Sequence, residues 1–272
     1  MITNNQTLGG VGRAFHHQKA LITFVTGGDP TLETTKALLP AMEQAGADLI
    51  EIGIPFSDPV AEGVIIQDAN ERALKNGTTT DKIFDLVKEV RTEVTVPLVF
   101  LSYLNPIYTY GSEKFMQRCA QCGVEGLIIP DLPFEEKAEL SAICEAYGVE
   151  LISLIAPTSH QRIKQIAKVA EGFIYCVSSM GVTGIRRQIE TNLKEMLLSA
   201  KEVSNIPCAV GFGIATPEQA RDMARLSDGA IVGSAIVNII AEQGESCVPD
   251  VCDYIRRMKA GVNQANKDLK ET

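Results

Sequence analysis

Short apolar runs alternate along the chain with longer segments in which apolar residues recur at helical spacing. An apolar run bounded by polar turn residues is typical of a buried strand, and recurrence every three or four residues is typical of an amphipathic helix. Eight such runs predict strands at Leu21–Thr26, Leu49–Gly53, Leu98–Tyr103, Gly126–Ile129, Leu151–Ile155, Phe173–Val177, Cys208–Gly211 and Ala230–Val232.

The amphipathic segments between the runs predict the helices. Capping residues next to prolines mark two helix starts, at Asp29-Pro30-Thr31 and Thr216-Pro217-Glu218. A further helical pattern, Gln67–Asn76, lies within the longest stretch without a strand, Pro55–Pro97. The remaining helices are predicted at Leu32–Ala45, Asp81–Glu93, Glu113–Cys122, Glu135–Tyr147, Gln161–Ala170, Leu193–Val203, Pro217–Leu226 and Ala235–Gln243.

A succession of strand–helix units predicts right-handed crossovers and a parallel sheet. Eight units in 272 residues match a (β/α)8 TIM barrel, which typically takes about 250 residues. We therefore predict an α/β fold with one barrel domain over residues 1–272 and extra helices. Residues 1–19 are expected to close the bottom of the barrel, and the polar residues 261–272 to form a frayed tail.

The alternative architecture is a doubly wound open sheet. That fold favours a GxGxxG fingerprint directly after the first strand. The chain instead has Gly27-Gly28-Asp29-Pro30 at that place, so the barrel is the favoured prediction.

Charge and composition narrow the class of protein. The net charge of -9 argues against nucleic acid or an anionic membrane as the main partner. No apolar run is as long as a membrane span, and the polar N-terminus has no signal-peptide core. The seven cysteines are scattered, and the CxxC at Cys119 and Cys122 has neither a second pair nor nearby histidines. This pattern indicates reduced thiols of a cytoplasmic protein rather than a zinc or redox site.

The second predicted strand carries an acid inside its apolar run. Strand alternation turns Glu51 to the same face as Leu49 and Gly53, and apolar residues on both faces indicate a parallel strand covered on both sides. A carboxylate there is costly unless it is paired or used. Glu62 follows in the next loop, so the two form a candidate acid/base pair. The alternative is a paired structural acid at Glu51 and a solvated loop acid at Glu62.

Barrel enzymes place their chemistry at the C-terminal ends of the strands. None of the predicted strands contains a lysine, which argues against a Schiff base, and none contains a histidine, which argues against a histidine-ligated metal. The remaining residue types favour acid/base chemistry without a cofactor or metal. These strand ends carry Thr26, Glu51, Tyr103, Asp131, Thr158, Ser178, Ser179, Gly211 and Gly233.

Two adjacent strands run into glycine turns, Gly211–Ile214 and Gly233-Ser234, each followed by a helix start. Glycine lets the backbone approach a ligand and helix N-termini favour anions, so these turns predict a phosphate site. The alternative is that they only make tight turns. The glycine-rich loop Ser178–Arg187 predicts a lid over a ligand, and its alternative is an ordinary exposed connection.

Several motifs, in order from about Leu21 to Gln243, resemble the tryptophan synthase alpha subunit family. The phrase around Glu51 is the most specific of them. The motifs are Phe24–Pro30, Glu51–Pro59, Asn105–Ile107, Asp131–Pro133, Ala156–Thr158, Gly181–Gly184, Gly211–Ile214 and Gly233–Val237.

The resemblance implies a (β/α)8 barrel that performs retro-aldol cleavage of indole-3-glycerol phosphate to indole and glyceraldehyde 3-phosphate. This reaction needs no cofactor. The implied partner is a beta subunit that carries pyridoxal phosphate, receives the indole within an α2β2 complex and makes L-tryptophan. The implied docking surface comprises Pro55–Pro59, Asn105–Tyr108 and the predicted lid, with the apolar loop residues Phe56, Ile107 and Tyr108. The alternative is that these three apolar residues pack on their own barrel.

The resemblance also implies roles for single residues. Glu51 resembles the family's catalytic acid/base, and Glu62 stands where the family has a catalytic aspartate that binds the indole N–H. The implied substrate-binding residues are Phe24, Tyr103 and Tyr175 around the indole, Gly184, Gly213, Gly233 and Ser234 at the phosphate, and Thr183 in the lid.

One departure bears on activity. The family has aspartate, glycine and proline where this chain has Glu62-Gly63-Val64. The added methylene displaces the carboxylate, and the missing proline loosens the loop. Three interpretations stay open: an alpha subunit whose loop adapts to Glu62, a stand-alone lyase that releases free indole, and a weakly active or inactive subunit that regulates a beta partner.

Overall fold

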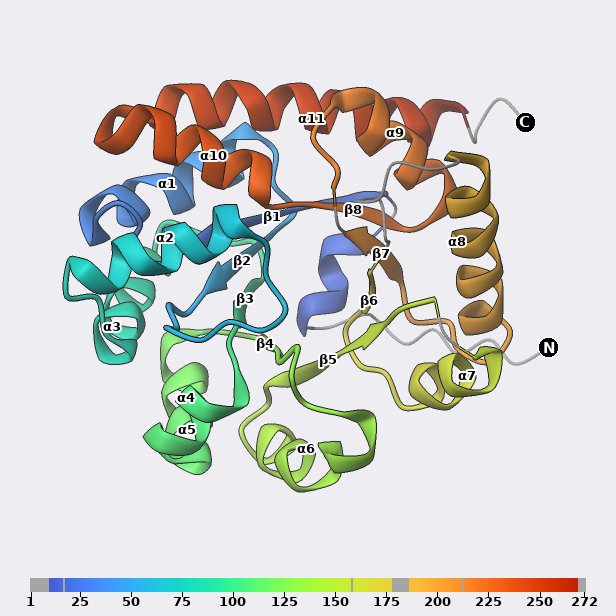
Figure 1. The fold of residues 1–272 in the computed structure, drawn as a ribbon, viewed down its shortest axis with the longest axis horizontal. Helices are drawn as coiled ribbons and strands as arrows, with labels where there is room; N and C mark the ends of the chain where they lie inside the picture. The colour runs from blue at the N-terminus through green and yellow to red at the C-terminus, as the bar shows by residue number, and fades with distance from the viewer. Residues whose placement is uncertain (1–9, 17, 158, 178–185, 212, 269–272) are drawn as a thin grey trace.

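The computed structural model describes residues 10–16, 18–157, 159–177, 186–211 and 213–268. Eight parallel strands close into a barrel in chain order, with β8 paired to β1, and helices surround them (Figure 1). This confirms the predicted TIM barrel with extra helices. The strands are β1 Ala20–Thr26, β2 Leu49–Gly53, β3 Leu98–Leu101, β4 Gly126–Ile128, β5 Glu150–Ile155, β6 Ile174–Val177, β7 Cys208–Gly211 and β8 Gly229–Val232.

The strand alternation predicted for β2 is present in the barrel. Ile50 and Ile52 belong to the large apolar cluster that the strands share with the outer helices, whereas Leu49 belongs to the separate cluster inside the barrel. The register pairs Glu51 with Phe24 on β1 and with Val99 on β3, so these three side chains lie at one level. Glu51 therefore projects into the barrel above a floor of apolar residues.

The helices follow the predicted order, with shifts at their ends. Helix α2 begins at Val64, earlier than predicted, and a 3-10 turn, η2 Phe134–Glu136, precedes α6. The helices are α1 Leu32–Ala45, α2 Val64–Lys75, α3 Thr80–Val90, α4 Leu104–Tyr110, α5 Ser112–Cys122, α6 Lys137–Ala146, α7 His160–Lys168, α8 Arg186–Lys201, α9 Pro217–Leu226, α10 Ser234–Gln243 and α11 Val248–Asp268, with a 3-10 turn η3 Gly244–Ser246.

The prediction that the chain frays from residue 261 is wrong for the residues up to 268. Helix α11 continues to Asp268 and packs against α9 and α1 across the top of Figure 1. Its buried side chains Val251, Ile255, Met258 and Val262 follow helical spacing. The prediction relied on the polar composition of the tail, to which the residues on the opposite face of α11 contribute, and so it missed this buried stripe.

The bottom of the barrel is closed by the short 3-10 helix η1, Gly10–Phe15, which Figure 1 shows in dark blue within the ring of strands. Val11 and Phe15 pack with the side chains at the lower ends of the strands. Arg13 forms an ion pair with Glu125, which also pairs with Arg91. The described part of the N-terminal segment thus seals the end opposite the strand tops.

Helix α2 is fixed to the loop after β1. The guanidinium of Arg72 donates two hydrogen bonds of 2.8 Å to the buried carboxylate of Asp29. Asn76 Nδ2 donates to the carbonyl oxygen of Pro30 over 2.5 Å. Because α2 follows directly on the loop that carries Glu62, this anchoring holds that loop at the barrel mouth.

Candidate active site

A cavity of about 1070 Å³ opens at the C-terminal ends of the strands. Its wall is mostly apolar, with Leu101, Ile128 and Ile231 from three strands. Glu51 and Glu62 are the two carboxylates among the described residues that line it. A concave apolar site with a few polar groups is the usual form of a small-molecule site.

Glu51 lies on the cavity wall without solvent around it. The residue is 1% exposed, and its Oε1 atom has no hydrogen-bond partner among the described residues. Burial disfavours the charged form and raises the pKa of Glu51 to about 8. This carboxyl therefore holds a proton at neutral pH and can release and recover it within the physiological range.

Glu62 is also partly buried but, unlike Glu51, it is hydrogen-bonded. Asn70 Nδ2 donates to Glu62 Oε2 over 2.7 Å, and the Tyr103 hydroxyl also bonds this carboxylate. Burial raises the pKa of Glu62, while the two hydrogen bonds favour the ionised form and oppose that rise. The two acids of one cavity thus have different surroundings, which is the usual basis for different protonation states.

Two aromatic rings reach the cavity because glycines leave room for them. The ring of Phe24 lies where a Cβ on Gly53 would be, 2.8 Å away, and the Tyr175 hydroxyl lies 2.6 Å from the same position on Gly211. Phe24 and Tyr175 both line the cavity. Burial, with the charge of Glu51 as a further cause, raises the pKa of Tyr175 well above its usual value.

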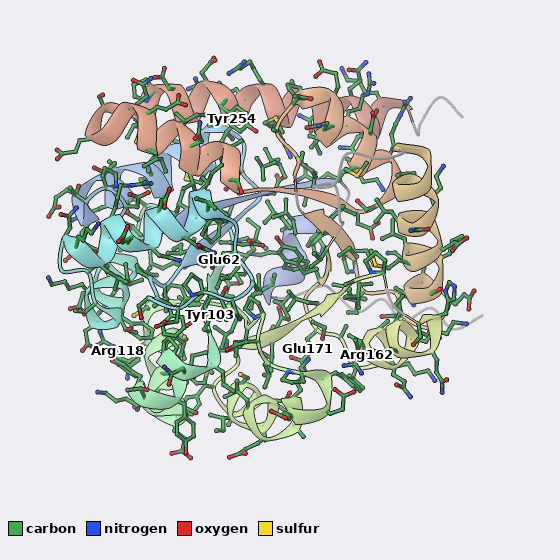
Figure 2. All side chains as sticks on the ribbon, viewed as in Figure 1. Glu62, Tyr103, Arg118, Arg162, Glu171 and Tyr254 are labelled. Atoms are coloured by element: carbon green, nitrogen blue, oxygen red, sulfur yellow. The ribbon has the colours of Figure 1, made fainter. Side chains whose placement is uncertain are left out.

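Tyr103 is a neighbour of Glu62, and its predicted contact with the indole stays a prediction. It is absent from the cavity lining, with its ring packed on Phe56 at a centroid distance of 5.4 Å. Its hydroxyl accepts a hydrogen bond of 3.1 Å from the Ala61 N–H and contacts Glu62. Figure 2 shows Glu62 and Tyr103 near one another, to the left of the helix at the centre of the barrel. Tyr103 can therefore affect the cavity through its contact with Glu62.

Asn70 was missed in the sequence. It lies on α2 beside the buried residues Ala69 and Ala73, and its side chain is itself buried. The sequence did contain a signal, a single amide on an otherwise apolar helical face. Burying such an amide is costly unless it is hydrogen-bonded, so its presence indicates a specific partner. The prediction placed an extra helix here but assigned no role to its polar residue.

Three predicted anion-binding residues lie on one side of the cavity. Gly213 follows β7 with a φ of 75°, a backbone conformation that favours glycine. Gly233 is the N-cap of α10 and Ser234 its first residue, and all three line the cavity. The first backbone N–H groups of a helix have no partner within the helix, so this end of α10 suits an anion. Thr183, Gly184 and the rest of the predicted lid up to residue 185 lie outside the described residues, and the last two residues predicted for the lid, Arg186 and Arg187, begin α8.

The apolar residues expected at a docking surface divide into two groups. Ile107 is fully buried in α4, so the prediction that it faces a partner is wrong: it packs on its own barrel. Tyr108, in contrast, is 77% exposed. Val60 and Val64, on either side of Glu62 in the chain, are also exposed.

Among the described residues, no cluster of three or more His, Cys, Asp or Glu side chains has the arrangement of a metal site. All seven cysteines are buried and free, and no described helix is long and apolar enough to cross a membrane.

Comparisons with known proteins point to one family. The sequence model described as tryptophan synthase alpha chain matches residues 13–263. The tryptophan synthase alpha chain of Lacticaseibacillus casei is 46% identical over 249 residues, which cover 92% of this chain and 94% of that relative. The crystal structure of tryptophan synthase subunit alpha from Legionella pneumophila str. Paris is 35% identical, with a TM-score of 0.85 over 93% of this chain and 98% of its own.

The raised pKa of Glu51 predicts how stability depends on pH. The folded state keeps this proton until about pH 8, whereas an unfolded chain releases it near pH 4.5. The neutral carboxyl therefore contributes fully to the free energy of unfolding below about pH 4.5. This contribution is lost as the pH rises through about 8. At about 1.4 kcal/mol per pKa unit, the loss amounts to several kcal/mol.

Urea unfolding from about pH 5 to about pH 9 measures this loss. Glu51→Gln cannot ionise, so its free energy of unfolding should decline less with pH than that of the wild type. Glu71→Gln, on the exposed face of α2, is the control and should follow the wild type. Parallel curves for Glu51→Gln and the wild type would contradict the assignment.

Proposed function

This chain belongs to the tryptophan synthase alpha chain family, and we propose on that premise that Glu51 and Glu62 carry out the cleavage of indole-3-glycerol phosphate. The products are indole and glyceraldehyde 3-phosphate. The observation that supports this most is the pair itself: one buried carboxyl with a pKa of about 8 and one hydrogen-bonded carboxylate on the wall of the same cavity.

Glu51 is the acid and then the base. Its proton goes to C3 of the indole ring, which makes the ring cationic and leaves Glu51 as a carboxylate. The carboxylate then takes the proton of the glycerol hydroxyl next to the ring. That oxygen becomes the aldehyde oxygen, the bond to indole C3 breaks, and its electron pair returns to the ring. Glu51 ends protonated as it began, and a pKa near neutral pH suits both transfers.

Glu62 stabilises the cation. A carboxylate at the indole N–H accepts its hydrogen bond and offsets positive charge that appears only as C3 is protonated. Phe24, Leu101 and Tyr175 then enclose the ring from the apolar wall. The cleavage proposed here uses these side chains and no cofactor.

The phosphate binds to backbone N–H groups at Gly213, Gly233 and Ser234. This proposal is supported by the N-terminus of α10 on the cavity wall and by the turn geometry of Gly213. Thr183 and Gly184, which we assign to the lid and the phosphate from the family motif, complete the site.

The proposed partner is a beta subunit that carries pyridoxal phosphate and takes the indole on to L-tryptophan in an α2β2 assembly. Tyr108, Val60 and Val64 are exposed apolar residues near the cavity loop and would be covered in such a complex. The buried free cysteines support a reducing compartment, and we propose the cytoplasm.

The roles of the two acids predict different kinetic losses. Glu51→Gln keeps the shape but cannot carry a proton, so kcat should fall about 10²- to 10⁴-fold. Glu62→Ala should lower kcat far more than it raises KM, and Glu62→Asp should retain or raise kcat. Glu71→Ala serves as control, because Glu71 is exposed on α2 and is part of neither the cavity wall nor the implied docking surface. Steady-state kinetics with the partner present would refute the assignment if Glu51→Gln turned over within a few-fold of the wild type.

The phosphate site predicts an effect of charge at the start of α10. Ser234→Asp should keep the helix stable, because an acid is favourable at a helix N-terminus, yet it should repel the phosphate and raise KM sharply. Ser234→Ala keeps the backbone N–H and should raise KM much less. Equal KM values for the wild type and Ser234→Asp would place the phosphate elsewhere.

An indole-release assay with and without a beta subunit separates the remaining interpretations. An alpha subunit should cleave slowly alone and much faster in the complex. Fast release of free indole without the partner, and no complex at micromolar concentration by size-exclusion chromatography, would indicate a stand-alone lyase. No turnover in either condition would indicate a regulatory subunit.

A further inference from the structure

The carboxylate of Glu62 is held from two sides by residues that do not carry out the chemistry. Asn70 Nδ2, from the second turn of α2, donates to Glu62 Oε2 over 2.7 Å. The Tyr103 hydroxyl, from the segment that joins β3 to α4, bonds the same carboxylate. These two supports come from separate elements, so they restrict the side chain in more than one direction.

Both supports are buried and pre-arranged. Asn70 is 4% exposed, and Tyr103 is 1% exposed with its ring on Phe56. The Tyr103 hydroxyl accepts the N–H of Ala61, so its own proton is free to point to Glu62. A buried amide or hydroxyl without a hydrogen-bond partner is costly in free energy. The burial of Asn70 and Tyr103 therefore favours their hydrogen bonds to Glu62.

Helix α2 gives Asn70 a fixed place. The two hydrogen bonds from Arg72 to Asp29 tie the helix to the loop after β1. In addition, Gln67 Nε2 donates over 2.7 Å to the backbone carbonyl of Glu62, not to its carboxylate. The loop backbone and the carboxylate are therefore held by different residues, which allows their effects to be separated by experiment.

We propose that Asn70 and Tyr103 are positioning residues that hold the Glu62 carboxylate at the cavity wall, where this chain has glutamate instead of the family's aspartate. The longer side chain has one more rotatable bond and loses more conformational entropy when it is fixed. Two hydrogen bonds to the charged carboxylate offset that loss. This inference rests on the proposed role of Glu62, and it moves Tyr103 from the indole contact to the support of Glu62.

A double-mutant cycle tests whether the two residues act through Glu62. In the wild-type background, Asn70→Ala and Tyr103→Phe should each lower kcat about 10- to 100-fold with little change in KM. In the Glu62→Ala background, the same substitutions should lower kcat hardly further, because the group they position is gone. Tyr103→Phe keeps the ring on Phe56, so it removes only the hydroxyl.

Gln67→Ala is the matched control, because it removes a hydrogen bond of the same length from the same helix to the same residue. Its kcat should stay within a few-fold of the wild type. All variants are assayed as the full chain with the beta subunit present, on indole-3-glycerol phosphate.

The outcomes separate this inference from the proposed function. Wild-type kcat for Glu62→Ala would overturn both. A slow Glu62→Ala together with wild-type kcat for Asn70→Ala and Tyr103→Phe would overturn only the positioning role. Equal losses in the two backgrounds, or a loss in Gln67→Ala as large as in Asn70→Ala, would also overturn it, because the substitutions would then disturb the loop rather than the carboxylate.

Discussion

The burial of one carboxyl inside the barrel is the constraint on which the site depends. A parallel barrel covers each strand on both faces, so an acid that points inward has no water to stabilise its charge. Glu51 has this position on β2, at the level of Phe24 and Val99. Burial raises its pKa to about 8, and a carboxyl that would otherwise be ionised becomes a proton donor.

The second acid is also partly buried, but unlike Glu51 it has hydrogen-bond partners. Glu62 stands on a loop at the same cavity, and Asn70 and Tyr103 bond its carboxylate. Hydrogen bonds to the charged form favour a carboxylate, whereas a dry pocket favours the acid. The barrel supplies the dry position and the extra helix α2 supplies the hydrogen bond, which are the two surroundings that the proposed mechanism requires of one cavity.

The sequence predicted the parts of the structure that depend on local pattern. The apolar runs placed the eight strands, and the acid in Leu49–Gly53 marked the inward face of β2. Contacts between distant segments were not predictable in the same way. The proximity of Tyr103 to Glu62 was not foreseen and Asn70 was missed, because the approach of α2 to the segment after β3 has no local signature.

The central claim is that Glu51 is protonated at neutral pH because it is buried inside the barrel. Infrared difference spectroscopy of the chain with isotope-labelled glutamate measures this directly. We expect the carbonyl band of a buried carboxylic acid that disappears with a midpoint near pH 8 and is absent from Glu51→Gln. The account would be contradicted if the spectrum at neutral pH contained only ionised carboxylates, or if the acid band persisted unchanged in Glu51→Gln.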